Sequence, residues 1–304
     1  MSILVVGTVA LDSVKTPFGK VTEALGGSAT YFSLAANIFT KVKLVGVVGA
    51  DFPNEYVLFL KERGIDLEGL QQIEGKTFRW KGEYRYDLNA AITLETQLNV
   101  LEIFSPEIPP QYQDTEFIFL ANIDPELQLN VLEQLKSPKL VVADTMNFWI
   151  ERKKDALLEV LKKIDIAILN DGEARQLTNE PNLINAAKKI LSLGPKRVII
   201  KKGEHGSLMV SKSRFAKSRF FSAPAYPLES IFDPTGAGDS FAGGFLGYLA
   251  SQEKISEQEM KKAIICGTTV ASFTVEDFSV NRLMTLTKEE IKKRYLKIKK
   301  ITRF

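Results

Sequence analysis

A glycine-rich turn that leads into a helix is the segment of this chain best suited to chemistry. Residues 233–244 read DPTGAGDSFAGG, and Phe241, Phe245, Tyr248 and Leu249 then recur at helical spacing. The first backbone N–H groups of a helix have no partner within the helix, and the helix dipole adds partial positive charge there. Since glycines leave the start of the helix open, this junction is a ready site for a phosphate or another anion.

Asp239 stands in the expected first turn of this helix, where a bound phosphate would repel its carboxylate. A catalytic role would offset that repulsion, because Asp239 can accept the proton of a substrate hydroxyl. The amides of Gly236, Ala237 and Gly238 would then stabilise charge on the transferring phosphoryl group. The alternative is that Asp239 only complements the helix dipole and the glycines only permit tight packing. The sequence contains no P-loop motif, and no dinucleotide-binding glycine motif follows the first expected strand.

Composition excludes several other kinds of site. With His205 as the only histidine, multi-histidine metal sites are excluded, and acid–base chemistry falls to Asp, Glu or Lys. The single cysteine, Cys266, excludes an internal disulfide and fits the reducing cytoplasm. The net charge of +3 is concentrated in residues 288–304, which read as a solvated amphipathic helix. We therefore expect neither a nucleic-acid partner nor a membrane partner, and no apolar stretch is long enough to cross a bilayer.

The elements that must position these residues alternate between short apolar strands and helical patterns. Strands are expected at 3–7, 43–49, 117–123, 140–143, 166–170 and 198–201, and helices at 26–39, 125–135, 153–164, 183–193 and 261–275. Strands this apolar are typical of a mostly parallel sheet covered by helices on both faces. Residues 12–25 and 76–104 break the rhythm and predict a small separate sheet. We therefore expect one α/β domain over residues 1–304 that carries a β-rich lid.

Four segments, in this order, are similar to the ribokinase-like (PfkB) carbohydrate kinase family. Gly26-Gly27 resembles the double glycine of the family, and Asn170-Asp171-Gly172-Glu173 resembles its Asn-x-x-Glu element. Residues 202–206 (KGEHG) resemble its Lys-x-Gly-x-x-Gly nucleotide loop, and residues 233–244 resemble its carboxy-terminal signature. The resemblance spans nearly the whole chain. It implies a three-layer ribokinase-like fold with a small β-sheet lid, which agrees with the architecture expected from the pattern alone.

The resemblance also implies roles for individual residues. Asp239 would be the general base, and Gly236, Ala237 and Gly238 the anion hole. Asp12, Gly26 and Gly27 would bind the substrate, and Asn170 and Glu173 would organise Mg²⁺ and phosphate through water. The nucleotide would also contact Lys202, Gly203, Gly206 and Thr235. Each segment has a simpler interpretation: Asp12 could start a turn, Asn170 and Glu173 could cap a helix, and Gly203 and Gly206 could serve a turn between strands.

The sequence departs from the family pattern on the substrate side. Many sugar kinases of this family carry an asparagine where this chain has Tyr31, which could stack on a ring or narrow the pocket. In the lid, Phe78 and Trp80 would suit a base or the apolar side of a sugar ring, and Arg79 would suit an anionic group on the substrate. Packing within the lid is the alternative for the two aromatic residues. Asn147, which follows an expected core strand, is a further substrate-binding candidate.

We therefore expect an ATP- and Mg²⁺-dependent kinase that phosphorylates a hydroxyl of a sugar or sugar derivative. A nucleoside kinase of the same fold is the first alternative, and a non-catalytic ligand-binding protein is the second. The sequence does not decide whether a monovalent cation binds near Asp233, as the family resemblance allows. It also leaves open the choice between a monomer and a lid-mediated homodimer.

Overall fold

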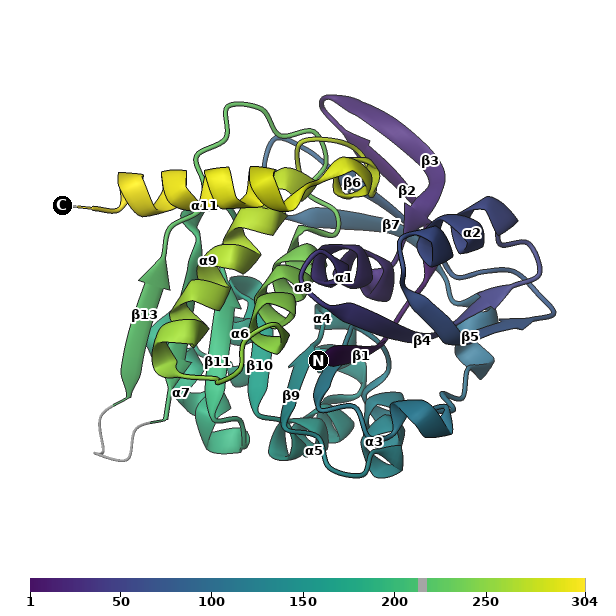
Figure 1. Cartoon of the computed structure of the whole chain (residues 1–304), viewed down its shortest axis with the longest axis horizontal. Helices are drawn as coiled ribbons and strands as arrows, with labels where there is room; N and C mark the ends of the chain where they lie inside the picture. The colour runs from purple at the N-terminus through teal and green to yellow at the C-terminus, as the bar shows by residue number, and fades with distance from the viewer. Residues whose placement is uncertain (213–217, 304) are drawn as a thin grey trace.

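A nine-stranded sheet runs through the centre of the molecule (Figure 1). The structure is a computed structural model that describes residues 1–212 and 218–303. The order of the strands is β13-β12-β11-β10-β9-β8-β1-β4-β5, and all neighbours pair in parallel except β12, which is antiparallel to both β11 and β13. Their bounds are β1 (Ser2–Val6), β4 (Lys41–Gly49), β5 (Asp66–Ile73), β8 (Phe117–Leu120), β9 (Leu140–Asp144), β10 (Ile166–Asn170), β11 (Arg197–Lys201), β12 (Ser207–Ser211) and β13 (Arg219–Ala223).

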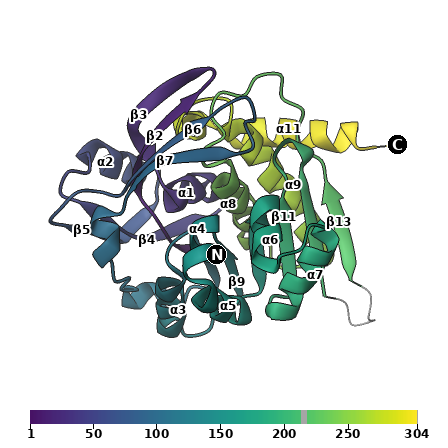
Figure 2. The ribbon, with the colours of Figure 1, turned by 180° about the vertical axis from the view of Figure 1, so that it is seen from behind.

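Helices cover both faces of this sheet. One layer contains α1 (Ser28–Asn37), α8 (Ala237–Ala250), α9 (Glu257–Thr274), α10 (Asn281–Thr285) and α11 (Lys288–Ile301). The other, which faces the viewer in Figure 2, contains α3 (Pro125–Gln134), α4 (Asn147–Arg152), α5 (Lys154–Lys163), α6 (Asp171–Thr178) and α7 (Leu183–Leu193). Within β1, Ile3 and Val5 pack in the first layer's core and Leu4 in the second's. This alternation explains why the central strands are apolar throughout.

A second sheet has four strands in the order β3-β2-β6-β7. Its members are β2 (Ala10–Thr16), β3 (Gly19–Gly26), β6 (Arg79–Tyr84) and β7 (Ala91–Gln97). These strands lie within or close to the two segments expected to form a separate sheet. Because β2 begins just after the carboxyl end of β1, the small sheet lies beyond that edge of the large one (Figures 1 and 2). We call this four-stranded sheet the lid.

The remaining helical elements are α2 (Asn54–Glu62) and the short 3-10 helices η1 (Asn99–Ile103), η2 (Pro110–Tyr112) and η3 (Gly203–His205). The expected terminal helix is α11, and Phe304 lies outside the described residues. Within residues 1–212 and 218–303, the structure contains no helix with the length and apolar character needed to span a bilayer. The large mostly parallel sheet between helices and the small separate sheet confirm the predicted fold class.

Candidate active site

Polar side chains end three neighbouring strands of the large sheet. Asp144 is the last residue of β9, Asn170 of β10 and Lys201 of β11, and Asn170 pairs directly with Lys201 in the register of the two parallel strands. The carboxyl ends of parallel strands meet at one edge of a sheet, which is where open α/β sheets bind their ligands. The apolar residues before each end anchor the strand in the core, so the terminal side chain is held at that edge.

The amino-terminal end of α8 carries the predicted anion site. Asp233 holds the preceding turn, because its Oδ1 accepts the amide hydrogen of Thr235 at 2.9 Å, and Gly236 follows with a left-handed φ of +73°. No side chain caps this helix. Ala237 donates its amide to the carbonyl of Pro234 at 3.2 Å, whereas the amides of Gly236 and Gly238 have no acceptor among the described residues. The structure therefore leaves the two glycine amides free and engages that of Ala237, unlike the three free amides expected from the sequence.

Asp239 lies in the first turn of α8, half-buried beside these amides. Burial raises the pKa of its carboxyl to about 8, and the negative charge of Asp144 adds to the rise, while Lys201 opposes it. A carboxyl group whose pKa lies in this range can accept a proton from a substrate hydroxyl near neutral pH. Both the position and the electrostatics of Asp239 suit the general base predicted from the sequence.

Lys201 is a residue of this site that the sequence interpretation missed. Its ammonium donates to Oδ2 of Asp144 at 2.9 Å, and both side chains are largely buried, with exposed fractions of 18% and 6%. Burial opposes its charge, but Asp144, Glu173 and Asp239 outweigh burial and raise the pKa of Lys201. The spacing Lys-x-Gly-x-x-Gly also fits Lys201 as its first residue, whereas Lys202 is followed directly by a glycine. The predicted match was therefore placed one residue too late.

Asn170 and Glu173 form a capping box at the start of α6. Oδ1 of Asn170 accepts the amide of Glu173 at 2.8 Å, and Oε2 of Glu173 accepts the amide of Asn170 at 2.7 Å. The helix-capping interpretation is therefore correct for this pair. Burial, with a further contribution from Asp144, raises the pKa of Glu173 to about 8.

The residues present fit a magnesium ion that arrives with a nucleotide. Within the described part of the chain, no three His, Cys, Asp or Glu side chains are grouped so that they could hold a metal. Mg²⁺ commonly keeps several waters and is bound by one or two carboxylates together with substrate phosphates. Asp144, Glu173 and Asn170 supply oxygens of this kind at the edge of the sheet.

Asp12 and the double glycine lie together where the lid joins the core. Oδ2 of Asp12 accepts the amide of Gly27 at 3.2 Å, and a Cβ at Gly26 would lie 2.0 Å from the same oxygen. Gly27 has a φ of +94°, and a Cβ there would lie 2.5 Å from the carbonyl oxygen of Thr8. Burial raises the pKa of Asp12 to about 7, although the Gly27 amide opposes the shift. Asp12 lies within β2, which excludes the interpretation that it starts a turn.

Tyr31 lies behind the anion site and not in front of it. The side chain is 1% exposed, and a Cβ added to Gly236 would lie 2.3 Å from its ring carbon Cδ1. Burial raises the pKa of its hydroxyl, and the negative charges of Asp12 and Asp233 act in the same direction. The ring therefore packs against the turn that contains Gly236. Because it is buried there, it is not placed to stack on a substrate ring.

Arg79, predicted to meet an anionic substrate group, is held by two carboxylates instead. Its Nε lies 2.6 Å from Glu23 and its Nη1 lies 2.8 Å from Asp51. Trp80 donates its indole N–H to Thr93 at 3.2 Å, which is the packing within the lid that formed the alternative. In place of the predicted substrate interactions, Arg79 and Trp80 make contacts within the lid and, through Asp51, with the loop that follows β4.

The other substrate-side candidates lie at the edges of this region. Phe78 is half-buried immediately before β6, and Asn147 is exposed at the first position of α4. Asn122, which the sequence interpretation missed, follows β8, and its Oδ1 accepts the indole N–H of Trp149 at 2.9 Å. Asn122 carries no motif, so only its place after an apolar strand could have drawn attention to it.

The predicted nucleotide loop forms the turn between β11 and β12, as the simpler interpretation of its glycines proposed. Lys202 donates its amide to the carbonyl of Gly206 at 2.8 Å, and Gly203 and Gly206 have φ values of +53° and +80°. Asn89, from the hairpin between β6 and β7, reaches this turn: Nδ2 of Asn89 lies 3.3 Å from the carboxylate of Glu204. The tip of the lid therefore touches the turn between β11 and β12.

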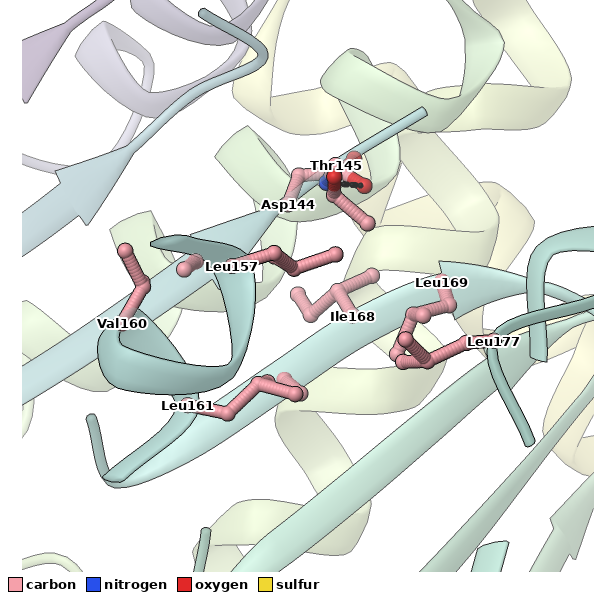
Figure 3. Close-up of a pocket in the computed structure, with 10 residues that line it drawn as sticks. Asp144, Thr145, Leu157, Val160, Leu161, Ile168, Leu169 and Leu177 are labelled. Carbon is pink, nitrogen blue, oxygen red and sulfur yellow. Dashed lines mark hydrogen bonds between the residues drawn. The ribbon is translucent and has the colours of Figure 1, made fainter. Parts of the chain in front are cut away.

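A small cavity lies beneath Asp144, within the layer of α5 and α6 (Figure 3). Its volume is about 10 Å³, and apart from Asp144 and Thr145 its lining is apolar. A volume of this size is close to the minimum for a single water molecule, so no substrate can bind there. The cavity is a packing defect behind the strand ends and is separate from the amino-terminal end of α8.

Comparison with known proteins places this geometry in a family. Residues 3–286 match the model of the pfkB family carbohydrate kinase. A cytidine kinase from Thermococcus kodakarensis is 33% identical over 256 residues, which cover 82% of this chain and 88% of that protein. A nucleoside kinase from Methanocaldococcus jannaschii is 26% identical over 292 residues, which cover 89% of each chain.

Solved structures share the fold. The crystal structure of the Methanocaldococcus jannaschii nucleoside kinase, described as an archaeal member of the ribokinase family, superposes with a TM-score of 0.76 at 22% identity, over 97% of this chain and 98% of that one. A nucleoside kinase from Burkholderia thailandensis in complex with inosine gives a TM-score of 0.79 at 18% identity, with 97% and 98% covered. The match of the family model over nearly the whole chain shows that this protein belongs to the pfkB family of carbohydrate kinases.

Proposed function

We propose that this protein is an ATP-dependent kinase that transfers the γ-phosphoryl group of ATP to a ribose hydroxyl of a nucleoside. The observation that carries the proposal is the convergence of Asp239 with the free amides of Gly236 and Gly238 at the start of α8. A proton acceptor and an anion site in adjacent residues are the two functions that phosphoryl transfer to an alcohol requires.

The residues of the chain have distinct parts in this reaction. Asp239 accepts the hydroxyl proton as the acceptor oxygen forms a bond to the γ-phosphorus and the bond from that phosphorus to the β,γ-bridging oxygen breaks. The amides of Gly236 and Gly238 stabilise the charge on the phosphoryl oxygens. ADP and the phosphorylated acceptor leave, and Asp239 then releases its proton to solvent. A magnesium ion bound with ATP, near Asn170, Glu173 and Asp144, would neutralise part of the phosphate charge.

A nucleoside is the favoured acceptor because the two relatives that are 33% and 26% identical over more than four-fifths of the chain are named as cytidine and nucleoside kinases. A 6-phosphofructokinase and a 2-dehydro-3-deoxygluconokinase cover 89% and 81% of the chain, at the lower identities of 22% and 23%. A relative named ribokinase matches only 43% of the chain. This choice revises the order given by the sequence alone, where a sugar came first and a nucleoside second.

The charges of the site favour an acceptor without a phosphate of its own. Asp12 and Asp239 both lie at this site with pKa values that are raised mainly by burial, to which the negative charge of Asp233 adds for Asp12 and that of Asp144 adds for Asp239. Arg79, the cation considered for an anionic substrate, is already paired with Glu23 and Asp51. A sugar phosphate would therefore meet carboxylates without a free cation from Arg79, whereas neutral hydroxyl groups can donate to those carboxylates.

The proposal can be tested by measuring ADP release, with Mg²⁺ and ATP, across cytidine, uridine, adenosine, inosine, ribose and fructose 6-phosphate. We expect turnover with at least one nucleoside, with a kcat/KM about tenfold or more above those of ribose and the sugar phosphate. Turnover restricted to ribose would move the acceptor class to free sugars. Nucleotide binding without turnover on any acceptor would favour the non-catalytic alternative.

The raised pKa of Asp239 predicts the pH dependence of this activity. The free enzyme needs an ionised Asp239, whose pKa is about 8 because of burial and the nearby charge of Asp144. Below that value the ionised fraction rises with pH, so kcat/KM should increase by about tenfold per pH unit from pH 6 to 7 and level off above pH 8. A profile of kcat/KM for the best nucleoside between pH 5.5 and 9.5 measures this. A flat profile from pH 6 to 8 would exclude Asp239 as a base with this pKa.

A further inference from the structure

The ammonium of Lys201 lies against the amino-terminal end of α8. A Cβ added to Gly238 would be 2.8 Å from Nζ of Lys201, with Cε and Cδ of the lysine farther away at 3.5 and 3.7 Å. The side chain therefore points from the end of β11 toward the start of α8, and its ammonium is the group nearest to that helix. Gly238 immediately precedes Asp239, so this cation lies one residue from the proposed base.

The start of α8 is by itself an unfavourable neighbour for the ammonium of Lys201, which is held there by the nearby carboxylates of Asp144, Glu173 and Asp239. The amino-terminal end of a helix carries partial positive charge and presents N–H groups, so it repels a cation. The ammonium has three N–H donors, and Asp144 is its only hydrogen-bond acceptor among the described residues. The unused donors of Lys201 therefore lie close to the free amides at the start of α8. An anion bound between them would accept hydrogen bonds from both.

The neighbouring charges keep Lys201 in its charged form. Asp144, Glu173 and Asp239 together raise its pKa even though burial acts in the opposite direction. The Lys201–Asp144 pair is also the least exposed ion pair in the part of the chain that the structure describes. Asp144 therefore fixes the direction of the side chain without using all of its donors.

We propose that Lys201 is a phosphate-binding residue of the transfer step, whose ammonium binds a non-bridging oxygen of the γ-phosphoryl group while Asp144 orients it. This inference rests on the proposed kinase function and deepens it. The γ-phosphoryl is the group assigned because the ammonium lies at Gly238, beside the proton acceptor, and not in the turn of residues 203–206. Lys201 takes part in no covalent step; it stabilises charge on the group that moves.

The test is the Lys201→Met variant, which keeps most of the length of the side chain and removes its charge. We expect its affinity for the ATP analogue AMP-PNP, measured by calorimetry with Mg²⁺, to fall about tenfold or more, while its affinity for ADP changes less than threefold. With the best acceptor, kcat should fall about 100-fold or more, and Lys201→Arg should recover part of that loss. Lys196→Met is the matched control, because Lys196 makes a similar ion pair with Asp165 (2.7 Å) just before β11 but is 70% exposed. This control should behave like the wild-type protein.

A second variant separates phosphate binding from the release of the Asp144 charge. If Lys201 only masks Asp144, then adding Lys201→Met to Asp144→Asn should lower the affinity for AMP-PNP no further than Asp144→Asn alone does, and our inference would be wrong. If Lys201 binds the γ-phosphoryl, the double variant should bind AMP-PNP about tenfold or more weakly than Asp144→Asn alone, with a smaller change for ADP. An equal loss of ADP and AMP-PNP binding by Lys201→Met would likewise overturn it.

The two proposals fail in different ways. Wild-type turnover on a nucleoside together with unchanged kcat in Lys201→Met would remove the role of Lys201 and leave the kinase in place. Selective loss of AMP-PNP binding in a protein that phosphorylates no acceptor would support the phosphate site and count against the kinase.

Discussion

Replacing Asp239 by asparagine should lower kcat by about 100- to 10,000-fold with the best nucleoside, the range expected when a positioned general base is removed. The asparagine has nearly the same shape and can still receive a hydrogen bond, but it cannot accept the proton. The amides of Gly236 and Gly238 remain, so the affinity for ATP should change little. Steady-state kinetics with both substrates varied, together with calorimetric titration of AMP-PNP, would measure the two effects separately.

The stability of Asp239→Asn provides its control. The folded protein holds the pKa of Asp239 at about 8, well above the ordinary value of 3.8, so the native state binds this proton more tightly than the unfolded chain does. The stability linked to this group is therefore fully present below about pH 4 and is lost as the pH rises toward 8. Asparagine carries no such proton, so Asp239→Asn does not lose this stability as the pH rises. The difference in Tm, variant minus wild type, should therefore be larger at pH 8 than at pH 5. Near-normal kcat in a folded variant would show that Asp239 is not the base.

The free amides at the start of α8 and the place of Asp239 beside them could be predicted from the sequence because they depend on local features. Gly236, Gly238 and Asp239 are neighbours in the chain, and a glycine turn that enters a helix produces free amides wherever the helix packs. The capping box of Asn170 and Glu173 is local in the same sense, since both partners lie within one turn. The alternation of apolar strands and helices also predicted the layers, because strands covered on both faces must be apolar along their whole length.

Features that depend on distant partners could not be predicted in the same way. Arg79 is a surface cation in the sequence, and only the fold brings it to Glu23 and Asp51. Lys201 and Asp144 are 57 residues apart in the chain. The sequence does not distinguish Lys201 from the adjacent Lys202, because only the register of β11 decides which of the two side chains points toward Asp144. Tyr31 is a substrate candidate by position, but the packing of α1 against α8 places it behind Gly236.

Elements with mixed composition were the ones that the periodicity did not predict. β5 contains Asp66, Glu68 and two glutamines and lies at one edge of the large sheet, and β13 lies at the other edge with an exposed Phe220. Edge strands are covered less completely, so their sequences need not be continuously apolar. The expected helix over 26–39 begins only at Ser28, because Gly27 has a left-handed φ next to the carbonyl of Thr8.

Replacing Gly236 by alanine should damage both catalysis and stability. The residue has a φ of +73°, where an L side chain is strained, and the new Cβ would lie 2.3 Å from Cδ1 of the fully buried Tyr31. Either the ring or the turn must move, and moving the turn displaces one of the two free amides. We expect kcat to fall about 100-fold or more, as for the loss of one preorganised anion-hole donor. The free energy of unfolding should fall by about 1–3 kcal/mol. Steady-state kinetics and denaturant unfolding measure these two quantities.

Gly64→Ala isolates the contribution of backbone strain. Gly64 also has a left-handed φ, +81°, but a Cβ there would meet no atom within 4 Å, and the residue follows α2. This control should lose about 1 kcal/mol of stability and keep the wild-type kcat. If Gly236→Ala loses no more stability or activity than Gly64→Ala, the turn tolerates a side chain and the amides are not held in place by Tyr31. A larger loss in both quantities would mean that the closeness of Tyr31 makes glycine necessary at position 236, and that the ring acts on catalysis through the backbone and not by touching the substrate.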